Sequence, residues 1–327
     1  MMPEQAKTGG RPAQQRRAAV DDPSRFRPCC RDTCAMLLNA TLSALGALSV
    51  GLDGAPWLES GAVAIRNDAT WFSSTCPHNT QQAGARPCTF LFPQQEAPRT
   101  GTDELGPYTE HQVAWAYREA GPPPAPVFVT GVRSYAAHPD IAVLTQSFPI
   151  GLQPKNTHGG TGEIVSAFPT WGVSSSQLDL GVLLYEGVQC QNSRFFKWLS
   201  GAAFGAGDPG QSGSKRPDPD GSGMPLILTS AGGSTLVASP LEDFFTSAQT
   251  TSVYMNGSFS FGLQGTLSSV PPGHVHRTLL VAGSGVRAAT MKWGELLLKA
   301  AGGGKQRSMA WTLQGDVSLR SLSYYTE

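Results

Sequence analysis

The feature that most constrains the fold is a long series of short apolar runs, each ended by a turn signal. From Leu37 onward, runs of four to eight residues are separated by Gly, Pro, Asn or Asp, as at Asp53-Gly54, a strong hairpin signal. The pattern predicts about a dozen β-strands, with hardly a helix between them. A closed eight-stranded barrel would use fewer strands, so the sequence favours a mainly β sandwich of two large antiparallel sheets. The runs that carry this prediction include "TFLF", "HQVAWAY", "PVFVTGVRSY", "IAVLTQSFP", "LGVLLYEG", "STLVAS" and "HRTLLVAG".

The composition agrees with this fold class and narrows the range of partners. Charged residues make up only 15% of the chain, against 38 Gly and 25 Pro, which favours turns and strands over long surface helices. The net charge is zero, so no overall field attracts the protein to nucleic acid or to an acidic membrane. We therefore expect neither nucleic acid nor a membrane as a partner.

The basic N-terminal segment, residues 1–33, differs from the rest of the chain. It combines several Lys and Arg residues with almost no apolar content, which predicts disorder. A nucleic-acid-binding arm is one interpretation, and a solvated tail is the one we favour. The stretch Ala35–Val50 that follows is shorter than the ~20 residues of a spanning helix. It also contains Gly46, so we predict two strands around a glycine turn in preference to a signal anchor.

The cysteines and histidines give no convincing metal site. Cys29, Cys30 and Cys34 resemble a zinc motif only weakly, because no second ligand pair follows at a suitable distance. Cys76 and Cys88 enclose a short loop and could be bridged in an oxidising compartment. The two histidines of "HVHR" (His274 and His276) alternate on a strand and share a face, and we interpret them as a surface pair. We predict no metal and no cofactor.

One helix is predicted, at Val286–Ala301. Its apolar residues recur at spacings of three and four, and three consecutive glycines end it. The preceding Gly283-x-Gly285-x-x-Ala288 imitates a dinucleotide-binding fingerprint, but no β-α repeats surround it and no acidic strand end follows. We interpret it as a tight turn from strand to helix. The predicted apolar face consists of Ala289, Trp293, Leu296, Leu297 and Ala300.

A candidate sugar-binding segment is "GTDELGPYTEHQVAWAY", in which acids stand beside aromatic residues. Aromatic rings stack on the apolar faces of sugars and carboxylates accept hydroxyl protons, so we name Asp103, Trp115 and Tyr117 as candidate substrate-binding residues. Burial of the aromatic residues in the core is the competing interpretation, and we favour it. Glu110 and His111 are adjacent on a strand and must point to opposite faces, which disfavours an epimerase of the mutarotase type that joins such a pair at one sugar.

The ordered succession "PWLESGAVAIRNDATWFSS", "LTQSFPIGLQ", "IVSAFPTW" and "LVASPLEDFF" resembles a known family. It is similar to the N-terminal region of algal and protist glycoside-hydrolase-like proteins related to the α-galactosidase and raffinose-synthase clan. The resemblance implies a β-supersandwich like that of galactose mutarotase over residues 34–285. A linker helix and the first strand of a (β/α)8 barrel would then occupy residues 286–327, with "LSYYT" as that strand.

The same resemblance implies that the catalytic carboxylates belong to later barrel strands, so no residue here is matched to a catalytic role. We therefore expect an accessory, carbohydrate-associated region that is not catalytic by itself. A free-standing carbohydrate-binding or surface interaction module is the alternative. We also expect residues Gly302–Glu327 to be poorly ordered, and the helix to turn part of its apolar face toward a missing partner. Both features would favour self-association through the C-terminal segment.

Overall fold

The computed structural model describes residues 36–60, 62–76, 88–117, 126–154, 164–171, 180–186, 192–197, 221–222, 225–244, 246–251 and 259–302. The chain divides into two units, Met1–Cys34 and Ala35–Glu327, and all the described residues lie in the second. The basic N-terminal segment and the terminal "SLSYYTE" fall outside the described residues. The predictions made for them therefore stay predictions.

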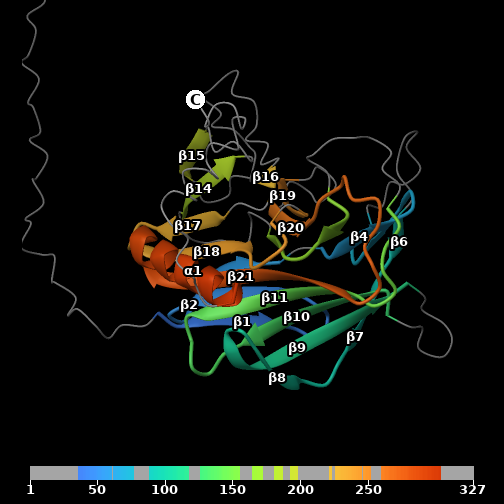
Figure 1. Cartoon of the computed structure of the whole chain (residues 1–327), viewed down its shortest axis with the longest axis horizontal. Helices are drawn as coiled ribbons and strands as arrows, with labels where there is room; N and C mark the ends of the chain where they lie inside the picture. Colours follow the sequence, from blue (N-terminus) through green and yellow to red (C-terminus); the bar gives the residue numbers. More distant parts are fainter. Residues whose placement is uncertain are drawn as a thin grey trace, which may run out of the picture. The chain divides into compact units, whose positions relative to one another are not determined.

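A ten-stranded antiparallel sheet forms the first layer of the fold (Figure 1). Its strands are, in spatial order, β15 (Asn192–Lys197), β14 (Leu180–Glu186), β17 (Leu226–Ser230), β18 (Ser234–Pro240), β21 (His274–Ser284), β11 (Ile141–Phe148), β10 (Phe128–Ser134), β9 (Gly106–Ala116) and β7 (Phe92–Gln95), with β8 (Arg99–Asp103) also paired to β9.

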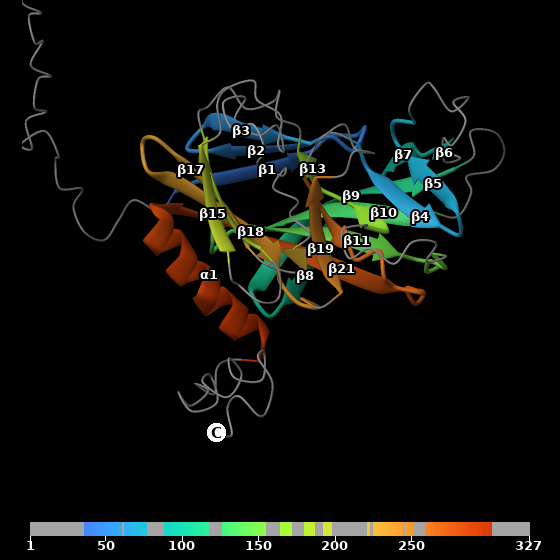
Figure 2. The same ribbon diagram turned by 90° about the horizontal axis from the view of Figure 1, so that it is seen from above.

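Three smaller sheets form the second layer. The first sheet contains β1 (Leu38–Leu42), β2 (Leu48–Leu52) and β3 (Ala55–Glu59). The second contains β12 (Ser166–Ala167), β4 (Ala64–Asn67), β5 (Thr70–Ser73) and β6 (Cys88–Phe90). The third contains β13 (Thr170–Trp171), β20 (Phe259–Leu263), β19 (Ser247–Thr251) and β16 (Gly221–Ser222). Figure 2 shows β1, β2 and β3 side by side. Backbone contacts join the three sheets at their edges, through the bridge Ser60–Trp171 and the hydrogen bond from Phe168 N to Phe261 O at 2.9 Å.

The main hydrophobic core lies between these layers. Its cluster takes Trp115 and Phe128 from the large sheet, and Trp57, Trp171 and Phe261 from the second layer. Alternate residues of each strand point to opposite faces, so one set of side chains in each layer faces the core. The described chain is therefore mainly β, with antiparallel sheets that pack as a sandwich, and the predicted fold class is confirmed.

The helix α1 (Val286–Ala300) begins where it was predicted and covers the part of the outer face of the large sheet that β18 and β21 form (Figure 1). Its apolar face packs with sheet residues in a second hydrophobic cluster, in which Leu296 is 6% exposed. The Trp293 indole N–H also donates to Ser239 Oγ at 2.6 Å. Ala289 and Leu296 of this face are buried against the sheet, whereas Trp293, Leu297 and Ala300 are only half-buried. The expected self-association through this segment therefore stays a prediction.

The turn into α1 explains the glycines that imitate a nucleotide-binding fingerprint. A Cβ at Gly283 would lie 2.7 Å from the backbone nitrogen of Ala289, so the strand and the helix approach too closely for a side chain. Gly285 caps the helix with a φ of 105°, which is unfavourable for other residues. Packing and backbone geometry account for both glycines, and the predicted strand-to-helix turn is confirmed.

The start of the described chain confirms the preference for strands over a signal anchor. β1 and β2 pair antiparallel on either side of a turn that contains Gly46 with a φ of 78°. No helix of the described ranges is both long and apolar enough to cross a bilayer.

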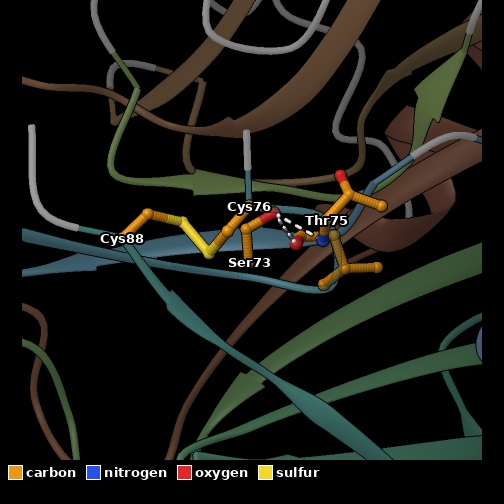
Figure 3. The surroundings of a disulfide bond; sticks show 5 residues. Ser73, Thr75, Cys76 and Cys88 are labelled. Atoms are coloured by element: carbon orange, nitrogen blue, oxygen red, sulfur yellow. Dashed lines mark hydrogen bonds between the residues drawn. A yellow bond between two sulfur atoms is a disulfide. The ribbon is translucent and has the colours of Figure 1, made fainter. Parts of the chain in front are cut away.

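The predicted link between Cys76 and Cys88 is present as a disulfide (Figure 3). It ties the end of the segment after β5 to the first residue of β6, which pairs parallel with β5. Next to it, Ser73 Oγ donates to Val63 O at 3.0 Å and accepts from Thr75 N at 3.2 Å. The covalent link and these hydrogen bonds fix one edge of the second layer.

Candidate functional site

A network of charged and aromatic side chains lies on the outer face of the large sheet, where β8, β9 and β10 meet. Arg133 of β10 forms an ion pair with Asp103 at 3.1 Å, and the Tyr135 hydroxyl donates to the same carboxylate at 2.7 Å. The other oxygen of Asp103 accepts from Leu105 N at 2.9 Å, in the turn from β8 to β9. Burial, and then the hydrogen bond to Asp103, raise the pKa of Tyr135, so its hydroxyl stays protonated. Asp103 is thus fully engaged within the protein.

Glu110 of β9 extends this network into the sheet. Its carboxylate lies 3.3 Å from Arg133 Nε and accepts from Thr145 Oγ1 at 2.8 Å, and the residue is only 4% exposed. A Cβ at Gly131 would lie 2.4 Å from Thr145 Oγ1 and 2.9 Å from Glu110 Oε1. The glycine therefore leaves room for a buried carboxylate. Burial alone would lower the pKa of Arg133, but Glu110 and the neighbouring tyrosines outweigh it and raise the pKa.

A pocket of about 510 Å³ opens beside this network. Tyr108 and Tyr135 stand in its wall and meet edge to face, with ring centroids 6.1 Å apart. The Arg133 guanidinium lies 4.4 Å from the centre of the Tyr108 ring. The network therefore fixes both rings from behind. The remaining wall of the pocket is apolar or carries hydroxyls, from Leu37, Leu38, Thr100, Gly101, Pro107, Thr109, Ser134, Ala136, Pro139 and Ile141.

A second ion cluster lies on the outer face around Arg277 of β21. Arg277 contacts Glu104 at 2.6 Å and is also bound by the carboxylate of Glu242. These groups bind one another across three parts of the chain and so leave little capacity for an external ligand. We interpret this cluster as structural.

The structure does not bring the three predicted sugar-binding residues together. Asp103 lies at one end of the β8–β9 hairpin, opposite Gly106. Trp115 lies nine residues further along β9, roughly 30 Å away at the usual rise per residue, and on the inner face. It is 1% exposed and its indole N–H donates to Thr130 Oγ1 at 2.9 Å. The structure thus places Trp115 in the core, as the competing interpretation expected.

Tyr117, just beyond β9, is 42% exposed and packs against Phe72, with ring centroids 5.6 Å apart. It remains available at the surface, far along the strand from Asp103. Glu110 and His111 point to opposite faces, since Glu110 is buried in the network while His111 is exposed. That prediction is confirmed.

The predicted surface pair of histidines is wrong for one of its members. His276 is 1% exposed and projects into the core, whereas His274 is half-buried and stacks on Phe148 at 6.1 Å. Alternation did place both on one face, but that face is the inner one. Within the described ranges, no group of three or more His, Cys, Asp or Glu side chains is arranged to hold a metal ion.

Sequence reasoning missed Arg133 and Tyr135, which organise the outer network. They lie in "GVRSY", which was interpreted only as a strand, although Arg133 and Tyr135 alternate and so share a face. An arginine inside a strand that is otherwise apolar is a usable signal, because such a residue needs a carboxylate partner when it is buried.

No protein-family model and no curated protein matches the chain. Among solved structures it is similar to the α-N-acetylgalactosaminidase NagBb from Bifidobacterium bifidum, with a TM-score of 0.46, 12% identity, and coverage of 83% of this chain and 38% of that one. A Glycoside Hydrolase Family 97 enzyme from Pseudoalteromonas sp. strain K8, in complex with acarbose, gives a TM-score of 0.38 at 10% identity, with 77% and 34% covered. These structural neighbours are glycoside hydrolases at low identity, and the chain spans 38% or less of their length.

Proposed function

We propose that the chain is an accessory, carbohydrate-associated β-sandwich region of a glycoside-hydrolase-like protein, and that it binds carbohydrate without cleaving it. The observation that carries the proposal is the pocket in whose wall Tyr108 and Tyr135 stand among hydroxyl-bearing and apolar residues. Aromatic rings that are fixed in position and surrounded by hydroxyl groups suit the alternating apolar and polar surface of a sugar ring. The sequence resemblance to glycoside-hydrolase-like proteins supports the same ligand class.

The carboxylates beside the pocket support binding in preference to hydrolysis. A glycosidase uses two carboxyl groups that flank the scissile bond, one as acid and the other as base or nucleophile. Asp103 and Glu110 instead share one guanidinium, and each accepts further hydrogen bonds from the protein. They hold the wall of the pocket in place.

The experiment is a glycan-binding screen of the full chain, followed by titration of any ligand found. We expect Tyr108→Ala to weaken binding about two- to tenfold, the loss typical of a removed stacking ring. His111→Ala is the matched control, because His111 is exposed on the same strand. Circular dichroism should show that both variants are folded.

Tyr117→Ala separates this pocket from the other exposed candidate. If binding is lost in Tyr117→Ala and kept in Tyr108→Ala, the sugar site lies at the far end of β9. If no glycan binds the wild-type chain, the proposal fails. The surface interaction module, with a protein as its partner, would then become the better hypothesis. Trp115→Ala is not an informative variant, because it would open a large cavity in the core.

A further inference from the structure

Three polar side chains meet on the inner face of the large sheet, inside the hydrophobic core. His276 and Thr278 are two residues apart on β21, so both project to that face. Gln146 stands directly opposite His276 on the paired strand β11. Each of the three is 1% exposed. They form one buried polar cluster, which we call the inner cluster.

Most hydrogen-bonding atoms of the inner cluster have no partner in the described part of the chain. These atoms are both ring nitrogens of His276, Thr278 Oγ1 and Gln146 Oε1. The exception is Gln146 Nε2, which donates to the carbonyl oxygens of Phe168 at 2.6 Å and Phe261 at 3.4 Å. Gln146 is thereby fixed across the gap between the layers, with its other amide atom unused.

Such a group of unpaired atoms requires a partner. A buried polar atom without a hydrogen bond loses the bonds it made to water in the unfolded chain, and native proteins keep very few such atoms. Here several of them lie on adjacent positions of two paired strands. A single bound molecule can satisfy more than one of them, as internal water does in other proteins.

The chemistry of the inner cluster specifies what that molecule must be. A neutral imidazole offers one donor and one acceptor, Gln146 Oε1 only accepts, and the Thr278 hydroxyl does either. Burial, with a smaller effect from His274, lowers the pKa of His276 to about 4, so the ring is uncharged at neutral pH. The inner cluster therefore holds no charge to balance an ion, which a buried site would require. A neutral hydroxyl group, which both donates and accepts, complements it.

We propose that the inner cluster is an internal binding site for a neutral hydroxyl-bearing molecule, held by His276 and Gln146. Ordered water and a small polyol both carry the required group. This site is separate from the pocket beside Tyr108, since none of the three residues of the inner cluster lines that pocket, and it does not depend on the proposed carbohydrate binding.

A crystal structure of the full chain grown without polyols tests the proposal directly. We expect a peak of electron density within about 3.2 Å of a His276 nitrogen and of Gln146 Oε1. A second crystal soaked in glycerol separates the two sources, because a polyol site shows glycerol density and a water site is unchanged. An empty site in both crystals overturns the proposal.

Substitution of His276 gives a second, independent test, because the proposal predicts that the variant is less stable than the wild type. His276→Leu removes the main partner of the bound molecule and leaves Gln146 Oε1 unpaired, so we expect the unfolding equilibrium constant to rise about tenfold or more. His276→Gln, which keeps one donor and one acceptor, should fall between His276→Leu and the wild type. His274→Leu is the control on the same strand. If His276→Leu is as stable as the wild type or more so, the site is empty and the proposal is wrong.

Discussion

The two faces of the ten-stranded sheet differ in whether their polar side chains have partners. On the outer face, Asp103 and Glu110 share the guanidinium of Arg133, and hydroxyl donors complete the network. On the inner face, His276 and Gln146 are neutral and keep unpaired atoms within the described chain. The charged groups of the outer face thus have charged partners within the chain, whereas the inner cluster keeps hydrogen-bonding atoms for which the described residues supply no partner.

The difference distinguishes polar side chains that bind one another from polar side chains whose atoms are available to bind a ligand. Buried charges are tolerated when each has a partner. On the outer face, a glycine at position 131 leaves space for the buried carboxylate of Glu110. The outer network of Asp103, Glu110 and Arg133 affects function indirectly, since it holds Tyr108 and Tyr135 in the wall of the pocket.

Removing the shared cation should break the outer face. Arg133→Ala leaves Asp103 and Glu110 buried without it, so we expect a loss of about 3–5 kcal/mol in the free energy of unfolding, measured by urea denaturation. Arg99→Ala is the matched control, because its ion pair with Glu96 is exposed (63% and 38%) and should contribute less than about 1 kcal/mol. Equal losses in the two variants would show that the outer network is not structural.

Lowering the pH should reduce the free energy of unfolding through protonation of His276 on the inner face. Its pKa is lowered by burial and by His274 from 6.5 to about 4 in the folded chain, and Glu242 opposes this only weakly. The unfolded chain therefore binds a proton that the folded chain excludes. His276 costs no stability above pH 6.5 and about 3 kcal/mol once the pH has fallen through 4.

The measurement for His276 is the free energy of unfolding of the wild type and His276→Gln between pH 7 and pH 4. We expect the wild type to lose more stability over this range than the variant, which cannot titrate at this position. Parallel curves for the two proteins would contradict the prediction. His274→Gln, at the half-buried neighbour, serves as the control.

The helix that covers part of the outer face gives a third test. Leu296 is 6% exposed in the second cluster, so Leu296→Ala should cost about 2 kcal/mol or more, measured by thermal unfolding. Leu298 is 56% exposed on the same helix, and Leu298→Ala should stay within about 0.5 kcal/mol of the wild type. A negligible effect of Leu296→Ala would favour the prediction that the helix is a linker separate from the sandwich.

The smallest expected effect comes from a single hydroxyl of the outer face. Tyr135→Phe removes the donor to Asp103 but keeps the ring in the wall of the pocket. We expect a loss of about 1–2 kcal/mol in stability, with glycan affinity almost unchanged. If affinity falls while stability is kept, the hydroxyl contacts the ligand directly, and the division between structural network and binding surface must be redrawn.

Local patterns in the sequence predicted the type of the elements but not their number, since about a dozen strands were expected and the described residues contain 21. Short apolar runs predicted the strands, spacings of three and four predicted the helix and its apolar face, and Cys76 and Cys88 were predicted to be close enough to bridge. Each of these features follows from the spacing of residues along the chain, which can be read without knowing any long-range contact. The mainly β sandwich follows from the same information.

Which face of each strand is covered, and by which residues, depends on the tertiary structure. Alternation put His274 and His276 on one face, and Trp115 and Tyr108 on opposite faces, but it could not distinguish inside from outside. The large sheet has the second layer on one side and α1 on the other, so strands such as β21 are apolar on both faces and their pattern does not identify the core side. The partners of Arg133 come from β8 and β9, up to 30 residues earlier in the chain. Such contacts arise from strand pairing, and for that reason a buried imidazole and a shared guanidinium became visible only in the folded molecule.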